Sequence, residues 1–251
     1  MLKLYSFGPG ANSLKPLLTL YEKGLEFEGI RLNPAVFEHH SDWFKAINPR
    51  GQVPALVDDS YPGGRIITES TVICEYLEDK YPTSVKLRPD DLADRADMRV
   101  WTKWVDEYFC WCVSTIGWQR MVSQMAKAIS AEEFEERIKA IPIPEQQTKW
   151  RRARDGFPQD LIDEEMRKIA VSVRRLDDHL RDHEWLAGNM YSLADICNFA
   201  IAGGMDKGFA ELVNESDTPG LIRWMRQIQD RPAVKAMYAA VPMERLAPKE
   251  D

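Results

Sequence analysis

Two short segments of this sequence carry residue types that can hold a small peptide. In Gln52-Val53-Pro54, a proline opens a short apolar strand and leaves the backbone amide and carbonyl of Val53 free to turn outward. An X-Pro bond is also the place where a cis peptide costs least. Glu69-Ser70, fifteen residues after Pro54, opens a helical pattern and supplies a carboxylate, a hydroxyl and free amides for an amino acid's ammonium and carboxylate. A tight turn and an ordinary N-cap explain either segment alone, but together they predict a peptide-binding site.

The first eighty residues alternate between strand and helix patterns. Gly24 follows the first helical pattern in the position of a left-handed cap, and Pro82 ends the last one. The order βαβαββα fits a mixed sheet of four strands covered by helices. Strands are expected at 2–6, 25–32, 55–57 and 65–67, and helices after an N-cap at Ser13, at 42–47 and from Ser70.

After a linker at 82–90 the strand signals end and helical periodicity takes over. A helix is expected from about Asp91 to the region of Met121, with an inner stripe formed by Met98, Trp101, Val105, Tyr108 and Cys112. A polar stretch with prolines separates it from a long helix at 162–180. Later helix starts are indicated by a capping box and by prolines that suit a first turn, at Ser192–Asp195, Pro219 and Pro232. The sequence therefore predicts an α/β domain over 1–83 and an all-α domain over 91–251.

Composition limits the possible partners. Of the 251 residues, 44% are apolar and 29% charged, as in soluble globular proteins, and the net charge of −7 argues against nucleic acid as a partner. The sequence shows neither a membrane-spanning run nor a signal peptide, so no stable membrane insertion and a cytoplasmic location are expected. The four cysteines lack metal-ligand spacing and are expected to be buried free thiols, with no metal bound.

Several motifs in order resemble the glutathione S-transferases over nearly the whole chain. They are the βαβαββα half with Val53-Pro54 and Glu69-Ser70, and the helical half with Trp185-Leu186-Ala187-Gly188 followed by Ser192-Leu193-Ala194-Asp195. The chain is also similar to the bacterial glutathione-dependent β-etherases, which cleave β-aryl ethers of lignin, in segments 4–16, 99–108 and 144–147. Because the last two segments lie outside the glutathione site, they indicate the subfamily.

The resemblance implies a thioredoxin-like amino-terminal domain, an all-α carboxy-terminal domain, and glutathione as the consumed cosubstrate. It assigns Val53 to antiparallel pairing with the cysteinyl backbone of glutathione, with Pro54 cis, and Glu69 and Ser70 to the γ-glutamyl ammonium and carboxylate. Gln52 is expected at the γ-glutamyl or glycyl end.

The glycine end of the site is less well defined by the sequence. His40 is a candidate for the glycine carboxylate, but the His39-His40 pair also fits a solvated helix face. Family members often carry a lysine or arginine near this position, and this sequence lacks one there. A homodimer is a further implication of the resemblance.

Ser13 and Asn12 are the candidates for stabilising the glutathione thiolate. In a thioredoxin-like half the loop before the first helix points at the ligand sulfur, and a helix N-terminus lowers a thiol pKa. Ser13 can donate its hydroxyl to that sulfur or can simply cap its own helix, and Asn12 is the second donor. Because this loop contains no cysteine, the chemistry should be substitution by glutathione itself and not thiol exchange.

Aromatic residues of the helical half are candidates for binding a planar aryl substrate. Trp104, Tyr108 and Trp111 fall on a face adjacent to the core stripe, and Phe7 comes from the loop beside the sulfur. Aromatic residues at helical spacing are also typical of a plain core. The basic segment 149–154 fits either a cover for this pocket or a solvated surface.

The resemblance implies attack of the glutathione thiolate on the Cβ of an α-keto β-aryl ether, which expels a phenol and leaves a glutathione thioether. The ketone activates Cβ, so the protein must position the sulfur, keep it ionised and stabilise the leaving oxygen. One alternative keeps the fold but acts on another electrophile, as a general glutathione transferase or a glutathione-dependent isomerase. Another is a non-catalytic binding module, which the Glu69-Ser70 segment already disfavours.

Overall fold

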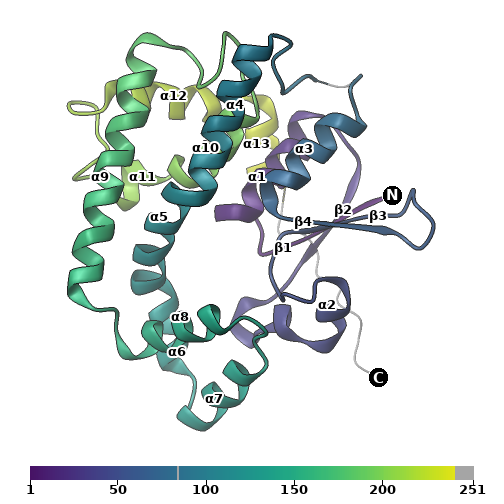
Figure 1. Ribbon diagram of the computed structural model, residues 1–251, viewed down its shortest axis with the longest axis vertical. Helices are drawn as coiled ribbons and strands as arrows, with labels where there is room; N and C mark the ends of the chain where they lie inside the picture. Colours follow the sequence, from purple (N-terminus) through teal and green to yellow (C-terminus); the bar gives the residue numbers. More distant parts are fainter. Residues whose placement is uncertain (84, 241–251) are drawn as a thin grey trace.

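The amino-terminal half is a four-stranded sheet with helices, in the computed structural model that describes residues 1–83 and 85–240 (Figure 1). Its strands are β1 (Leu2–Ser6), β2 (Phe27–Arg31), β3 (Ala55–Asp58) and β4 (Arg65–Thr68). Its helices are α1 (Ala11–Glu22), the 3₁₀ turns η1 (Pro34–Val36) and η2 (Glu38–His40), α2 (Asp42–Ile47) and α3 (Ser70–Lys80). This succession confirms the predicted βαβαββα order.

Every regular element after α3 in the described chain is helical, as expected. The elements are α4 (Leu92–Trp104), the π-helical turn η3 (Val105–Phe109), α5 (Cys110–Gly117), the π-helical turn η4 (Trp118–Val122), α6 (Ser123–Ala128), α7 (Ala131–Lys139), α8 (Pro144–Asp155), α9 (Gln159–Asp182), α10 (Leu193–Ala202), α11 (Met205–Gly208), α12 (Pro219–Gln229) and α13 (Pro232–Ala239). Residues 241–251, the end of the predicted helical domain, lie outside the described residues. None of the described helices combines the length and apolar character needed to cross a membrane.

The sheet has the strand order β2-β1-β3-β4, with β1 parallel to β2 and β3 antiparallel to both of its neighbours. Because side chains alternate along a strand, Leu2 and Leu4 of β1 face α1 and α3, whereas Tyr5 faces α2. The Tyr5 ring lies 5.8 Å from the ring of Phe44 in α2. Figure 1 shows α1 and α3 on one side of the sheet and α2 on the other. The α1–α3 side is the one that meets the helical half.

Several helix ends coincide with their sequence signals. Gly24, after α1, has φ +61°, the left-handed conformation expected there. At α10, Ser192 and Asp195 form the predicted capping box, with the Ala194 amide donating to the Ser192 Oγ (3.2 Å) and the Ser192 amide to the Asp195 Oδ2 (2.9 Å). The helices α12 and α13 begin at their predicted prolines.

The first helix begins earlier than predicted. Gly10 is its N-cap, so Ser13 is the third residue of α1 and not its cap. The Ser13 amide donates to the Gly10 carbonyl (3.1 Å) within the first turn, and its Oγ accepts from the Phe7 amide (3.4 Å), which lies outside the helix. Positive φ values at Gly8 (+96°) and Ala11 (+44°) allow this early start. The interpretation of Ser13 as the cap of its own helix was therefore wrong.

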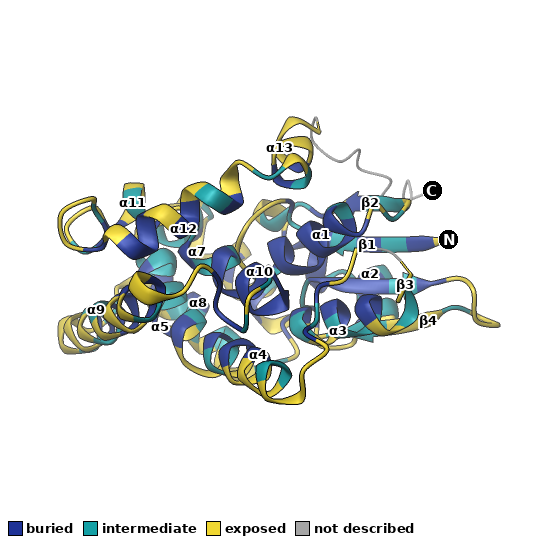
Figure 2. Cartoon of the chain, turned by 90° about the horizontal axis from the view of Figure 1, so that it is seen from above, coloured by how far each residue is buried: buried dark blue, intermediate teal, exposed yellow. Residues whose placement is uncertain are grey.

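Helix α1 is buried on nearly every side, between the sheet, α3 and α10 (Figure 2). Its buried charged side chains are all paired: Lys15 with Asp106 of η3, Lys23 with Glu78 of α3, and Glu22 with Arg231 after α12. The Arg231 guanidinium donates to both carboxylate oxygens of Glu22, at 2.6 and 2.8 Å. Breaking such a pair would leave an uncompensated buried charge, so the Lys15 and Glu22 contacts fix the two halves relative to each other.

The long helical run after residue 91 contains two π-helical turns that the sequence pattern did not reveal. The expected stripe residues Met98, Trp101, Val105 and Cys112 are buried, but Tyr108 is 37% exposed and Phe109 is buried in its place. A π turn is wider than an α turn, so η3 rotates Tyr108 away from the core and brings Phe109 into line. The placement of Tyr108 in the inner stripe was therefore wrong.

A cluster of aromatic residues attaches α7 and α8 to the amino-terminal half. The ring of Phe37, between η1 and η2, lies 4.3 Å from the ring of Trp150 in α8. His39 and His40 lie beside it, with their rings 3.9 Å apart, and both are buried (8% and 6% exposed). The interpretation of this pair as a solvated helix face was wrong, because η2 turns both rings inward, beside Phe37 and under Gly51. The contact between Phe37 and Trp150 holds α8 against the amino-terminal half.

Burial of these histidines predicts an acid-sensitive fold. Burial disfavours the charged imidazolium and lowers the pKa of His39 to about 3 and that of His40 to about 4. The unfolded chain, with histidine near 6.5, binds more protons, so stability is complete above pH 6.5 and is lost as the pH falls towards these values. His39→Phe keeps a ring and removes one titrating group. We expect its melting temperature to fall less than that of the parent protein between about pH 7 and 4.5, measured by circular dichroism.

Lys207→Gln is the control, since Lys207 is exposed in α11, in the helical half and away from the histidine pair. It should keep the pH dependence of the parent protein. The same acid-induced loss in His39→Phe and in the parent protein would contradict the assignment.

Candidate active site

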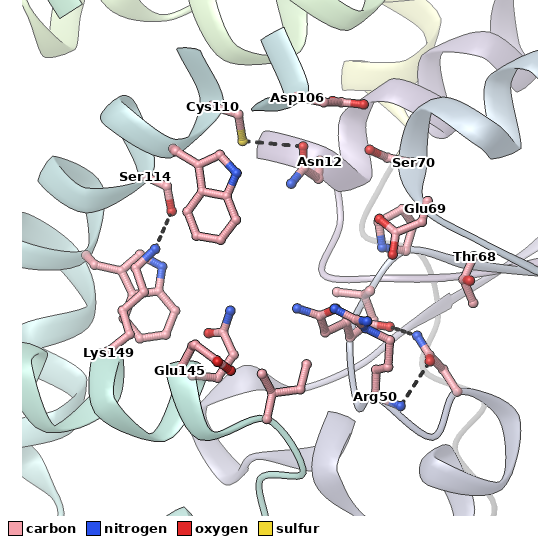
Figure 3. Close-up of a pocket in the computed structure, with 18 residues that line it drawn as sticks. Asn12, Arg50, Thr68, Glu69, Ser70, Asp106, Cys110, Ser114, Glu145 and Lys149 are labelled. Atoms are coloured by element: carbon pink, nitrogen blue, oxygen red, sulfur yellow. Dashed lines mark hydrogen bonds between the residues drawn. The ribbon is translucent and has the colours of Figure 1, made fainter. Parts of the chain in front are cut away.

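A cavity of about 440 Å³ lies where the two halves meet (Figure 3). One wall comes from the thioredoxin-like half: the start of α1, the loop before β3, and the junction of β4 with α3. The other wall comes from the η3–α5–η4 run and from α8. The lining includes seven of the predicted site residues: Asn12, Gln52, Val53, Pro54, Glu69, Ser70 and Trp111.

The loop before β3 is organised by Asn48, a buried residue that the sequence analysis did not select. Its side-chain amide donates to the Gln52 carbonyl (2.7 Å), and its Oδ1 accepts from the Arg50 amide (3.2 Å). Arg50 Nε in turn donates to Gln52 Oε1 (3.1 Å), which holds the guanidinium at the cavity. The Val53-Pro54 bond is cis, as expected, and the Val53 backbone amide and carbonyl have no hydrogen-bond partner among the described residues. Val53 thus presents a free backbone edge.

His40 supports this loop from behind instead of lining the cavity. Gly51 has φ +60° and lies directly on the histidine pair: a Cβ added there would be 2.4 Å from His40 Nδ1 and 2.8 Å from the His39 carbonyl oxygen. The neighbouring Arg50 is the cation at this end of the cavity. The sequence analysis had noted the lack of such a residue near His40.

Glu69 and Ser70 stand at the junction of β4 and α3. Glu69 is the N-cap of α3 and has φ +67°, a conformation that costs a non-glycine residue about 1–3 kcal/mol. Its carbonyl accepts from the Ile73 amide (2.9 Å), whereas its carboxylate has no hydrogen-bond or ion-pair partner in the described chain. The first amides of α3 and the Ser70 hydroxyl lie next to it. The pair thus offers an anion and a group of donors side by side, as the sequence predicted.

At the start of α1 the structure separates the two candidate donors. Asn12 lines the cavity, and its Oδ1 accepts from the Cys110 thiol of α5 (3.5 Å; Figure 3). Its side-chain N–H groups donate to none of the described residues. Ser13 is 3% exposed and does not line the cavity. Burial raises the pKa of the Cys110 thiol, so it stays protonated and serves as a donor to Asn12.

The helical wall is polar and aromatic. Asp106, Cys110 and Ser114 follow one another at spacings of four along η3 and α5, so they share one face and point into the cavity (Figure 3). Lys149 of α8 donates from Nζ to Ser114 Oγ (2.9 Å), and burial lowers its pKa to about 8. Segment 149–154 was expected either to cover the substrate pocket or to form a solvated surface, and the position of Lys149 favours the first.

Three of the predicted aromatic residues lie away from the cavity. Trp104 stacks on Phe109 (5.3 Å between ring centroids) in the core, and Tyr108 is turned outward by η3. Phe7 packs edge-on against His39 (5.0 Å), behind the loop that carries Arg50. Only Trp111 of that set lines the cavity, together with Trp118 of η4. The sequence offered one signal for the missed α8 residues: segment 144–147, which resembles the β-etherases, contributes Glu145 and Gln146 to the lining.

Comparison with known proteins identifies the family. Residues 1–79 match the glutathione S-transferase N-terminal domain, and residues 109–232 match the glutathione S-transferase C-terminal domain. The chain belongs to the glutathione S-transferase family. It is an enzyme of that type, and glutathione is its cosubstrate.

Individual relatives are similar over the full length. Protein LigF of Sphingobium sp. strain SYK-6 is 60% identical and aligns with 100% of this chain and 98% of its own length. The crystal structure of the beta-etherase LigF from the same strain matches 94% of this chain and 98% of that one, with a TM-score of 0.91 and 63% identity. Glutathione S-transferase 3 of Zea mays is 25% identical over 96% of this chain and 95% of its own. The resemblance to both the family and the β-etherases is thereby confirmed.

Proposed function

We propose that this protein cleaves β-aryl ether bonds in lignin-derived α-keto aromatic ethers by glutathione thiolate displacement at Cβ, releasing a phenol and a glutathione thioether. The observation that carries the proposal is the full-length similarity to the beta-etherase LigF, which includes the helical wall that meets the second substrate. A general transferase or a glutathione-dependent isomerase would use the same thioredoxin-like wall. The similarity to a β-etherase does not favour either alternative.

The thioredoxin-like wall has the groups that glutathione requires. The free backbone edge of Val53 pairs with the cysteinyl residue, and Pro54 holds that edge in place. The Glu69 carboxylate takes the γ-glutamyl ammonium, while the Ser70 hydroxyl and the α3 amides take the γ-glutamyl carboxylate. Arg50, steadied by Gln52, takes the glycine carboxylate in place of His40.

Asn12 is the proposed principal donor to the thiolate. Its free side-chain N–H groups face the cavity at the N-terminus of α1, where the helix dipole also favours an anion. Ser13, one residue further on, keeps the loop closed through the Phe7 amide. On the opposite wall the indoles of Trp111 and Trp118 receive the aryl ring of the ether.

Further points on assembly, location, domains and partners belong to this proposal. The chain acts as a homodimer in the cytoplasm, and it divides into a glutathione-binding domain over 1–83 and a substrate-binding domain over 91–251. The substrate is a small aromatic ether. No nucleic acid or metal takes part.

Glu69→Gln tests the ammonium contact, because it removes the charge with little change of shape. We expect glutathione affinity to fall by about 1.5–3 kcal/mol, or roughly tenfold or more, the range for a hydrogen bond to a charged group. Isothermal calorimetry measures this directly. Glu136→Gln, on the exposed surface of α7, should bind like the parent protein, and equal affinities in all three proteins would refute the assignment.

Asn12→Ala and Ser13→Ala distinguish the two thiolate donors. A donor to the thiolate lowers the pKa of bound glutathione, so its removal should raise that pKa, by about one unit for a single hydrogen bond. We expect the larger rise for Asn12→Ala, observed by titrating thiolate absorbance in the glutathione complex. A larger rise for Ser13→Ala would transfer the role to Ser13.

The products test the reaction itself. With an α-keto β-aryl ether we expect one phenol and one glutathione thioether per glutathione consumed, with inversion at Cβ when one enantiomer is supplied. The α-alcohol lacks the activating carbonyl and should react far more slowly. Mass spectrometry and chiral chromatography identify the products. Phenol release without glutathione, or with glutathione disulfide as the only sulfur product, would reject the proposal.

A further inference from the structure

Displacement of the aryloxy group requires a hydrogen-bond donor to the departing oxygen. Lys149 is in a position to be that donor. Its side chain reaches from α8 into the cavity and donates to Ser114 Oγ at 2.9 Å (Figure 3). Its Nζ lies 4.7 Å from the ring centroid of Trp118 and 5.6 Å from that of Trp111. The ammonium is therefore held by one hydroxyl and lies beside two indoles, those of the residues proposed to bind the aryl ring.

The charge of Lys149 is not neutralised by an ion pair. No Asp or Glu carboxylate lies within ion-pair distance of its Nζ anywhere in the described residues, whereas the buried Lys15 of the same region is paired with Asp106. An ammonium carries three N–H donors, and Ser114 accepts one of them. Two donors remain for a ligand in the cavity, and an anionic oxygen is the partner they favour.

The places at which Asn12 and Lys149 contact α5 match the geometry of a backside displacement at Cβ. Cys110, which contacts Asn12, and Ser114, which contacts Lys149, are four residues apart and therefore one turn apart on the same face. Asn12, from the start of α1, and Lys149, from α8, therefore contact α5 one turn apart. In a backside displacement the leaving oxygen lies opposite the sulfur across Cβ, so a thiolate donor at one level and an oxygen donor at the next are what the reaction needs. The other cation of the cavity, Arg50, is on the opposite wall and bonded to Gln52.

Resting on the function proposed above, we infer that Lys149 is the general acid of the reaction and donates a proton to the aryl ether oxygen as its bond to Cβ breaks. The sulfur electron pair forms the S–Cβ bond, and the Cβ–O electron pair passes to the phenolic oxygen. That oxygen takes the proton from Nζ. The resulting amine regains a proton from solvent, which balances the proton that glutathione lost when its thiolate formed.

The environment of Lys149 is consistent with this role. Removal from water lowers its pKa to about 8, so the ammonium is protonated at neutral pH but gives up its proton more readily than an ordinary lysine. The acid is therefore present below about pH 8 and is lost above it.

A series of ethers with different phenol leaving groups tests the inference. Protonation of the leaving oxygen matters most for phenols of high pKa and little for 4-nitrophenol. In Lys149→Gln we expect kcat to fall roughly a hundredfold or more with a methoxyphenol leaving group, the range for loss of a general acid, and less than about threefold with 4-nitrophenol. Lys149→Arg keeps the charge but does not release its proton, and it should show the same selective loss. Lys139→Gln, exposed on α7, should behave like the parent protein. Equal losses for all leaving groups, or full activity of Lys149→Arg, would overturn the acid role.

A binding measurement separates this inference from the proposed function. 4-Nitrophenolate absorbs visible light, so its pKa on the protein can be titrated without any reaction. The parent protein, saturated with S-methylglutathione, should lower that pKa and bind the phenolate at least tenfold more tightly than Lys149→Gln does. If the parent protein releases no phenol from ethers, the proposed function fails. The nitrophenolate titration still decides whether Lys149 binds a phenolic oxygen, and equal binding by both proteins would reject it.

Discussion

The burial of α1 between the sheet and the helical half is the constraint on which the rest of the structure depends. A helix with almost no solvent-exposed side can carry charged residues only if each finds a partner, and Lys15, Glu22 and Lys23 all do. The partners of Lys15 and Glu22 belong to the helical half. The same contacts that satisfy α1 therefore place its N-terminus, with Asn12, against α5. A cavity that needs both halves is the consequence.

The two walls of the cavity differ in how they are built. The thioredoxin-like wall is made of loops and a helix start, where unpaired backbone groups, a positive φ at Glu69 and the free edge of Val53 create binding capacity for a peptide. The helical wall is made of side chains on the η3–α5–η4 run and on α8, and its character follows from the π turns and from the packing of Trp150 on Phe37. In the proposed function, glutathione is bound by backbone groups and side chains of one half. The electrophile is selected by side chains of the other half.

The buried pair His39-His40 supports both the loop before β3 and the cluster that attaches α8. It fills the space behind Gly51, supports the loop that presents Arg50, and packs in the cluster that attaches α8. Neither ring reaches the cavity. Histidine often acts in catalysis, but these two histidines have a structural role, because burial keeps both imidazoles neutral.

The sequence by itself determined the elements whose signals are local: the βαβαββα order, α2 to the residue, the left-handed cap at Gly24, the capping box at Ser192, and the start of α3 at Glu69-Ser70. It could not place Ser13 within α1, because positive φ at Gly8 and Ala11 moves the helix start. It also could not place Tyr108, because a π turn shifts the phase of a helix without altering its apolar pattern. His40 was assigned to the wrong surface, since its ring lies under Gly51 and beside Phe37, whose own ring meets Trp150 of α8 more than a hundred residues further along the chain. Lys149 belonged to a basic run with two possible environments, and the contacts of α8 with Phe37 and with Ser114 of α5 decided between them. Local hydrogen bonding depends on neighbouring residues in the sequence. Burial, and with it the isolation of a charged side chain from water, depends on segments that meet only when the chain folds.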